Sequence, residues 1–349
     1  MITYEIWDGF DHYDAAHDPW PTVSGMPLYS TSYARFPAAP NCVGRGLACG
    51  TSVAKRWNLS GNRSGLVFSF AFGISSLSFA GYENFMNFQD LGVNQSLLAV
   101  SSAGALVVRN GAAGAVIGTT ATGVISPSST PVYFLDVVIG FGSSTGTFAV
   151  YLNTPFGGAP LLSLTGLNTI NTANAYANQF SIGELTGNTL TLYFDDFHCN
   201  SFTGSPAVLG EGTRIYTKMP GGAGYATVFT PNGAAANWQC VDEVPPDGDT
   251  SYVSTASFPA TEGYAVGAAG LNNTVNGVVR YSYVRKDDAG AHTFSNGVRS
   301  GGINGFSTAG SVNSAYSWQQ NVFLTDPNTG LGWTAANADA ASPVISAVT

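Results

Sequence analysis

Short apolar stretches, separated every 8 to 15 residues by glycine, serine, threonine and asparagine, run through the whole 349-residue chain. This punctuation is typical of β-strands joined by tight turns, and almost no segment shows the periodicity of a helix. Residues 65–73 and 147–152 alternate apolar with small or polar residues, as half-buried strands do, whereas residues 131–140 are almost continuously apolar. The pattern predicts an antiparallel all-β protein.

The distribution of these strands predicts two domains. Residues 1–203 contain enough short strands for a two-sheet sandwich, which folds as one domain by burying the inner faces of both sheets. Residues 200–210 lose the alternation and gain turn residues, so we place the domain boundary there. Strand patterns then resume, and they predict a smaller β domain over residues 204–334 followed by an alanine-rich tail at 335–349.

The composition excludes several classes of function. The chain has 12 basic and 21 acidic residues and a formal net charge of −9, whereas proteins that follow a phosphate backbone need clustered lysine and arginine. Every apolar run is broken well before the roughly 20 residues that a helix needs to cross a bilayer. We therefore expect no nucleic-acid partner and no membrane insertion. The N-terminus lacks the basic and apolar regions of a secretory signal, so we expect synthesis in a cytoplasm.

The four cysteines are too few and too scattered for a disulfide scaffold, and no pair has the short spacing of a zinc site. Cys42 and Cys49 could close a small loop if the protein ends outside the cell, and otherwise they are buried thiols. The sequence leaves these two states open.

Four stretches of the chain resemble a family of tailed-bacteriophage virion proteins with a laminin G-like, concanavalin A-like jelly-roll domain. They are the opening Asp8–Tyr13, the strand Tyr193–Phe197, the run Trp238–Val253 with its Val-Asp-Glu and Asp-Thr-Ser-Tyr-Val elements, and Leu324–Thr334 with its Asp-Pro-Asn-Thr-Gly and Trp-Thr elements. The resemblance extends from Trp7 to about Trp333. It implies that residues 1–203 form a jelly roll and that the smaller β domain follows it.

The resemblance also implies a role. Such proteins are minor structural components of the particle, at the tail, the fibres or the capsid surface as a decoration. We therefore expect a virion protein, made in the host cytoplasm, with other virion proteins as partners and with a homo-oligomeric state. Trimers are common among similar fibre and decoration proteins, but the sequence does not fix the number of subunits. The family has no agreed catalytic residues, so none is carried over to this chain.

The acidic residues also argue against an enzyme. A jelly roll could be a glycoside hydrolase, which needs two carboxylates across the scissile bond. Asp195 and Asp196 are adjacent in a predicted strand and therefore face opposite sides, and the Glu-x-Asp-x-Glu pattern of concanavalin-like glucanases is absent. We expect a non-enzymatic structural protein, with a polysaccharide depolymerase as the least favoured alternative.

Three aspartates are candidate metal ligands. Asp195 and Asp196, joined by Asp8 across the first and last strands, would offer the hard oxygen ligands that suit calcium. The alternative is structural, because paired acids at the end of a strand often only bind a loop, and no Asp-x-Asp-x-Asp-Gly loop is present.

The second candidate function is a lectin-like module that contacts a host cell-surface glycan. Aromatic residues in loop-like or strand-edge contexts stack on the apolar face of a sugar while neighbouring amides bind its hydroxyls. The candidate residues are Tyr29, Tyr33, Tyr82 and Phe85. The alternative is that such rings fill the sandwich core, as we expect for Trp7, Trp57 and Trp238.

Overall fold

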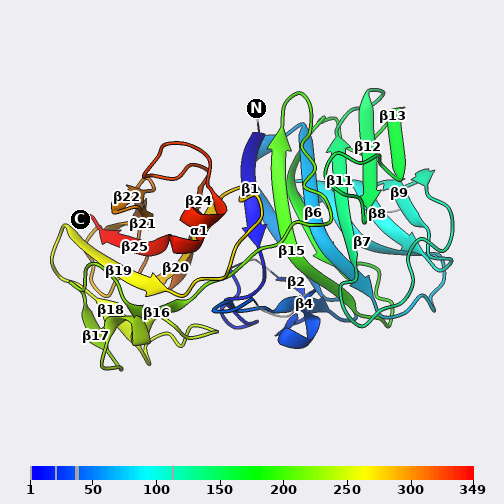
Figure 1. The fold of residues 1–349 in the computed structure, drawn as a ribbon. Coiled ribbons are helices and arrows are strands. Elements are labelled where there is room, and N and C mark those ends of the chain that lie inside the picture. The colour runs from blue at the N-terminus through cyan, green and yellow to red at the C-terminus, as the bar shows by residue number, and fades with distance from the viewer. Residues whose placement is uncertain (1, 20–21, 36–38, 112–113) are drawn as a thin grey trace. The chain divides into compact units, whose positions relative to one another are not determined.

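The computed structural model describes residues 2–19, 22–35, 39–111 and 114–349 (Figure 1). The predicted antiparallel all-β fold is confirmed, whereas the jelly-roll winding stays a prediction. No helix among the described residues is long and apolar enough to cross a membrane. The chain divides into two compact units, the first of Met1–Pro37 and Gly44–Ile215 and the second of Ala38–Val43 and Tyr216–Thr349.

The first unit is a sandwich of two sheets. The eight-stranded sheet has the order β13 (Leu162–Leu167), β12 (Gly146–Leu152), β11 (Tyr133–Gly140), β6 (Gly65–Ile74), β15 (Leu192–Phe202), β4 (Gly46–Cys49) and β3 (Leu28–Ser30), with β1 (Ile2–Asp8) also paired to β15. The seven-stranded sheet has the order β10 (Val116–Thr119), β9 (Leu106–Asn110), β8 (Val93–Ser101), β7 (Tyr82–Asp90), β14 (Ala177–Gly183), β5 (Ala54–Arg63) and β2 (Thr22–Ser24). Figure 1 shows β6, β11 and β15 in one layer and β7, β8 and β9 in the other.

Aromatic rings fill the space between the two sheets. The Trp57 ring on β5 stacks between Phe180 and Phe197, with centroid distances of 5.0 and 5.4 Å. Phe68 of β6 contacts Phe180 edge to face at 4.9 Å, which joins the two layers. Rings of this size each bury a large apolar area, so this cluster supplies much of the hydrophobic stabilisation of the unit. Trp57 and Trp7 are buried, as expected for core tryptophans.

The boundary between the units falls after Ile215, beyond the predicted boundary at residue 203. The intervening segment stays with the first unit because buried aspartates of the sandwich accept its backbone N–H groups. Asp136 of β11 accepts from Leu209 and Gly210 at 3.1 Å, and Asp196 of β15 accepts from Ile215 at 2.7 Å. These hydrogen bonds depend on tertiary contacts that a loss of strand alternation cannot reveal.

The second unit contains a six-stranded sheet and two two-stranded sheets. The larger sheet has the order β16 (Pro220–Ala223), β19 (Ala260–Val266), β25 (Ser342–Ala347), β21 (Thr293–Ser300) and β22 (Ile303–Phe306), with β23 (Gly310–Ser311) paired to β21. The smaller sheets pair β17 (Thr230–Asn232) with β18 (Tyr252–Ser254), and β20 (Val278–Val284) with β24 (Ser317–Phe323). Two short 3-10 helices are also present, η1 (Thr31–Tyr33) in the first unit and η2 (Asn237–Cys240) in the second. Trp238, which we expected in the core, is only partly buried against a cluster of this unit.

The alanine-rich C-terminal segment is an integral part of this unit, which corrects the expectation of a separate tail. It forms α1 (Ala335–Ala340) and then β25, which lies in the middle of the six-stranded sheet between β19 and β21. Val344 on β25 is fully buried. Ala338 of α1 and the following Ala341 pack with Val298 of β21 and Trp333 in one buried cluster. Small side chains allow such close packing but give the segment no apolar pattern that the sequence reveals.

The motif Leu324–Thr334 positions this segment. Asp326 is buried and accepts hydrogen bonds from the Asn328 backbone at 2.9 Å and from the Asn337 side chain at 2.6 Å. Trp333 donates from its indole nitrogen to the carbonyl of Phe323 at 2.8 Å. The motif therefore fixes the start of α1 against β24.

Candidate functional site

On the seven-stranded sheet, the side chains that point away from the sandwich core form a row across five neighbouring strands. The register places Arg56 of β5 opposite Ser181 of β14, and Ser181 opposite Asn87 of β7. It then places Asn87 opposite Leu97 of β8, and Leu97 opposite Arg109 of β9. Directly paired residues point to the same face of a sheet. With neighbouring strands about 4.8 Å apart, the row extends over about 19 Å from Arg56 to Arg109.

A second row, of amides, runs beside the first. Gln179 of β14 is paired with Asn58 of β5 on one side and with Gln89 of β7 on the other. Asn84, further along β7, points the same way. We call this surface the amide face. It consists of Arg56, Asn58, Asn84, Asn87, Gln89, Leu97, Arg109, Gln179 and Ser181.

The core of the sandwich fixes which residues form the amide face. Trp57, Phe180 and Phe88 occupy consecutive positions in the register, and all three rings are buried between the sheets. Side chains alternate along a strand, so burying these three rings turns their neighbours on β5, β14 and β7 outward. A register slip by one residue would expose the rings, and the amide face is therefore held by the hydrophobic core.

Several members of the amide face bind one another. Gln179 Nε2 donates to Asn58 Oδ1 at 2.7 Å, and Ser181 Oγ donates to Gln89 Oε1 at 3.1 Å. Arg109 Nη1 donates to Asn84 Oδ1 at 3.2 Å. These bonds hold the long side chains in defined positions, which reduces the entropy that a ligand would otherwise have to overcome on binding.

Other polar atoms of the amide face have no partner within the described part of the chain. They are Arg56 Nε, Asn87 Oδ1, Gln179 Oε1 and Arg109 Nε, and each is shielded from solvent. The Asn87 side chain is only 7% exposed. Leaving a buried polar group without a hydrogen bond costs roughly 1–3 kcal/mol, and a water molecule or a ligand on this face would offset that cost.

The amide face carries positive charge only. Its two guanidinium groups belong to Arg56 and Arg109, and neither forms an ion pair with a residue that the structure describes. The Arg109 guanidinium lies over the Tyr82 ring, 5.2 Å from its centroid, at the edge of the face. Tyr82 remains 36% exposed. The face thus combines amides, two cations and one accessible ring.

Of the four aromatic residues predicted to bind glycan, the structure places only Tyr82 beside the amide face. Phe85 is fully buried and stacks on Phe72 at 4.4 Å. Tyr33 is half-buried, and its ring lies 5.3 Å from that of Tyr193. The loop-like sequence context of Phe85 was misleading because a bulge on β7 turns this ring into the core.

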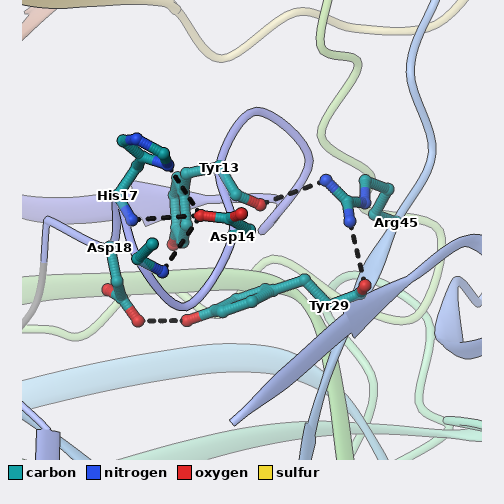
Figure 2. A network of polar contacts seen from close by, with 7 residues as sticks. Tyr13, Asp14, His17, Asp18, Tyr29 and Arg45 are labelled. Carbon is teal, nitrogen blue, oxygen red and sulfur yellow. Dashed lines mark hydrogen bonds and ion pairs between the residues drawn. The ribbon is translucent and has the colours of Figure 1, made fainter. Parts of the chain in front are cut away.

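Tyr29 belongs to a different structure, a polar network at the N-terminal end of the sandwich (Figure 2). Figure 2 shows its hydroxyl donating to Asp18, while its backbone carbonyl accepts from Arg45 Nη2 at 2.9 Å. The same Asp18 forms an ion pair with the buried Lys55. The Tyr29 ring packs edge to face on Tyr13 at 5.1 Å, and the side chain is nearly buried. This network fastens the loop after β1 to the sandwich.

The three aspartates predicted to bind calcium accept hydrogen bonds from the protein itself. Asp8 accepts from the Phe10 backbone at 2.7 Å and from the Tyr13 hydroxyl at 2.5 Å. Asp195 accepts from the Arg35 backbone at 2.7 Å. The described residues contain no group of three or more His, Cys, Asp or Glu residues arranged to hold a metal ion. The calcium site therefore stays a prediction that the described geometry does not support.

Burial governs the protonation of the aspartate pair. Burial, followed by the charge of Asp196, raises the pKa of Asp195 well above its usual range. Burial also raises the pKa of Asp196, to about 6. A bulge in β15 lies between Asp195 and His198, and Asp196 has a φ of 50° there. These carboxyls shape the bulge and bind loops, which is the structural alternative considered above.

A second carboxyl pair, which the sequence did not reveal, lies at the end of the seven-stranded sheet. Thr186 Oγ1 lies within hydrogen-bond distance of both Glu83 of β7 and Glu184, which comes just after β14. Asn188 Nδ2 donates to Glu83 at 2.8 Å. Three successive backbone N–H groups, those of residues 186–188, donate to Oε1 of Glu184 at 2.7–3.0 Å.

The two glutamates have opposite pKa shifts. Burial raises the pKa of Glu83 to about 7, and the nearby Glu184 also raises it. Burial would raise the pKa of Glu184 as well, but hydrogen bonds, first that of the Ser52 backbone, lower it. Such a split is typical of an acid–base couple, yet a retaining glycosidase keeps its carboxyls about 5–5.5 Å apart with the substrate between them. Here both side chains are buried and in contact, so the pair serves to fasten the loop at 184–188.

Cys42 and Cys49 are not joined by a disulfide in the part of the chain that the structure describes, and Cys49 is buried. Burial raises the pKa of the Cys49 thiol. The alternative of a buried thiol therefore holds for Cys49, whereas Cys42 is only half-buried.

No family model and no curated protein matches the chain. Among solved structures, the cellulose-induced protein Cip1 is similar over 58% of this chain and 100% of its own, with 15% identity and a TM-score of 0.40. A carbohydrate esterase from the Shiga toxin-encoding bacteriophage phi24B is similar over 57% of this chain and 100% of its own (13%, TM-score 0.34). A β-glucanase catalytic domain from Podospora anserina is similar over 54% and 87% (11%, TM-score 0.32).

These neighbours correct one expectation. The similar structures with stated activities are mostly carbohydrate-processing enzymes, among them the esterase, the glucanase, an arabinofuranosidase and a sialidase. The prediction that this chain is not an enzyme is contradicted by that finding and is withdrawn. At 10–15% identity and with TM-scores of 0.40 or less, the likeness assigns no activity in its place. What the site can do is therefore argued from the residues of this chain.

Proposed function

We propose that this is a carbohydrate-active protein whose amide face binds a polysaccharide chain. The observation that carries the proposal is a set of shielded polar atoms on the amide face, among them Asn87 Oδ1 and Gln179 Oε1, for which the described residues provide no hydrogen-bond partner. Sugar hydroxyls both donate and accept hydrogen bonds, and side-chain amides offer both functions in fixed directions.

The shape of the amide face favours a polymer over a single sugar. The row from Arg56 to Arg109 crosses five strands and covers about 19 Å, which is the length of several sugar rings. Tyr82 at one edge supplies a ring that can stack on the apolar face of a pyranose. Ligands of this kind are bound by a few well-placed polar groups and one or two rings, which is the combination found here.

The experiment is affinity electrophoresis or calorimetry of the whole chain against a panel of soluble plant and bacterial polysaccharides. We expect Asn87→Ala to bind at least tenfold more weakly than the wild type, because the variant loses an acceptor and a donor that the ligand fills, each contributing about 1 kcal/mol. Asn273→Ala, an exposed asparagine of the second unit, is the matched control and should bind as the wild type does.

Thermal unfolding of both variants separates a binding defect from a folding defect. The proposal would be overturned if the wild type bound no polysaccharide in the panel, or if a folded Asn87→Ala variant bound as tightly as the wild type. Reducing-end release measured in the same mixtures reports whether the bound chain is also cleaved.

We also propose the phage particle as the location of this protein. The support is the resemblance of Asp8–Tyr13, Tyr193–Phe197, Trp238–Val253 and Leu324–Thr334 to virion proteins. A glycan-binding face on a virion would meet the polysaccharide of the host surface. Immunogold labelling of intact particles tests the location, and the absence of label from every particle would contradict it.

A further inference from the structure

We propose that the polysaccharide bound by the amide face is acidic, with Arg56 and Arg109 receiving the carboxylates of uronate sugars. This inference rests on the proposed function, because it names the class of polysaccharide that the same face takes.

The charge balance of the amide face is the first argument. The chain as a whole is acidic, with a net charge of −9, yet this face contains two arginines and no carboxylate. Two other arginines are neutralised by a neighbouring carboxylate: Arg63 pairs with Glu5 at 2.5 Å and Arg285 with Asp249 at 2.8 Å. For Arg56 the described residues provide no ion pair. A cation left uncompensated among buried amides is matched best by an anion from the ligand.

Asp90, at the end of β7, is the acidic residue that follows the amide face along that strand, and its oxygens are already occupied. It accepts from Thr172 Oγ1 at 2.9 Å, from Asn174 Nδ2 at 2.8 Å and from Asn178 Nδ2 at 3.2 Å. These bonds fix its carboxylate on the loop between β13 and β14. Asp90 therefore does not serve as the counter-ion of the arginines.

The geometry around Arg56 fits a carboxylate that is carried on a sugar. A guanidinium presents parallel N–H groups that bind a carboxylate in bidentate fashion, and Arg56 Nε has no partner in the described part of the chain. Asn87 lies two strands away from Arg56 in the same row, and its Oδ1 can accept a hydrogen bond from a hydroxyl of the same sugar. Ser181, between them, is small and donates sideways to Gln89, so it leaves room above the sheet.

The separation of the two arginines favours a polymer with a recurring charge. Arg56 and Arg109 stand at the two ends of the row, four strand spacings or about 19 Å apart. One carboxylate cannot reach both. A chain of uronates would place one carboxylate at each end and sugar hydroxyls on the amides between them.

The test compares uronate polymers with their own uncharged forms. Polygalacturonate, alginate and hyaluronate are each presented to the whole chain as the acid and as the carboxyl methyl ester. We expect the acid form of at least one polymer to bind tenfold or more tightly than its ester. The preference should shrink as salt is raised, because added ions screen charged contacts at partly exposed sites.

Two variants locate the effect. Arg56→Gln should bring the affinity for the acid form close to that for the ester, and Arg56→Lys, which keeps the charge but loses the bidentate fork, should give an intermediate preference. Arg285→Gln removes the same charge from the second unit and should leave the preference unchanged. Melting curves of all three verify that they fold.

The outcomes separate the two proposals. If acid and ester bind equally well and Asn87→Ala weakens both, the acidic class is overturned and the proposed function stands. If Arg56→Gln and Arg285→Gln reduce the preference alike, the effect is one of net charge and the assignment to Arg56 is overturned. If the chain binds neither charged nor uncharged polysaccharide, both proposals fail.

Discussion

At the residue scale, most acidic side chains of the first unit act as acceptors for the backbone of loops. Glu184 accepts N–H groups from the loop that follows it. Asp136 and Asp196 accept N–H groups from the segment that ends at Ile215 and so hold it on the sandwich. A carboxylate oxygen is the strongest acceptor available for such groups. This use explains why acidic pairs in this chain look like catalytic or metal-binding pairs in sequence and are not arranged as such.

Glu83 gives a prediction about pH. Its pKa is about 7 in the folded protein because of burial, above the usual 4.5, so between these values the unfolded state releases a proton that the folded state keeps. The contribution of Glu83 to stability is therefore complete below about pH 4.5 and is lost as the pH rises through 7. The free energy of unfolding of the wild type should therefore fall between pH 5 and pH 8. In Glu83→Gln, whose side chain stays neutral, this fall should be smaller by about 1–3 kcal/mol.

Urea unfolding at pH 5, 6, 7 and 8 measures this difference. The lowered pKa of Glu184 acts only on acidification below about pH 4.5, outside the window. The pKa of Asp196 is also raised, so Glu83→Gln itself should lose stability as the pH rises. The effect of Glu83 is therefore the difference between the variant and the wild type at each pH. Glu211→Gln, an exposed glutamate, is the control. Parallel curves for Glu83→Gln and wild type would show that Glu83 does not titrate in this range.

At the element scale, β25 decides whether the second unit folds. It is the last strand of the chain and lies inside the six-stranded sheet, where it pairs with β19 on one side and β21 on the other. A central strand satisfies the backbone groups of both neighbours, so its loss would leave two edges unpaired. The alanine content of the segment lowers its apparent strand propensity, whereas its small side chains suit the packing of α1 against β21.

Val344 is the position at which this role can be tested. Its side chain is fully buried on β25, so Val344→Ala removes two methyl groups and leaves a cavity. We expect a loss of about 1.5–3 kcal/mol in the free energy of unfolding. Chemical denaturation measures it, with Val93→Ala, at an exposed site, as control. An equal and small effect of both substitutions would mean that β25 does not pack as described.

At the scale of the whole molecule, each of the two units packs hydrophobic clusters of its own. The aromatic cluster around Trp57 belongs to the first unit, and the cluster of Phe229, Tyr264, Phe294 and Ile345 belongs to the second. Each unit buries its own hydrophobic surface and has the size of an ordinary domain. The glycan-binding proposal concerns the first unit alone, because every member of the amide face lies there.

Calorimetry of the whole chain should resolve two unfolding transitions. Trp57→Phe, which shrinks the first core, should lower the temperature of one transition, and Val344→Ala should lower the temperature of the other. A single transition that both substitutions shift equally would show that the two units unfold as one cooperative body.

The amide face shows how far sequence patterns reach. The alternation in β5 predicts that Arg56 and Asn58 face away from Trp57, and the same reasoning applies to Gln179 and Ser181 on either side of Phe180. No local pattern states that β5, β14, β7, β8 and β9 are neighbours, because these strands come from residues 54 to 183 in a non-sequential order. The row from Arg56 to Arg109 exists only once those strands are paired.

The sequence by itself determined the all-β class, the positions of many strands and the burial of Trp7 and Trp57, because these follow from alternation and side-chain size, which act over a few residues. Tertiary structure alone decided which polar groups meet. It brought Glu83 beside Glu184, buried Phe85 through a bulge and placed the C-terminal strand at the centre of a sheet. Strand pairing depends on burying apolar faces that are distant in the sequence, and this pairing determines the geometry of the site.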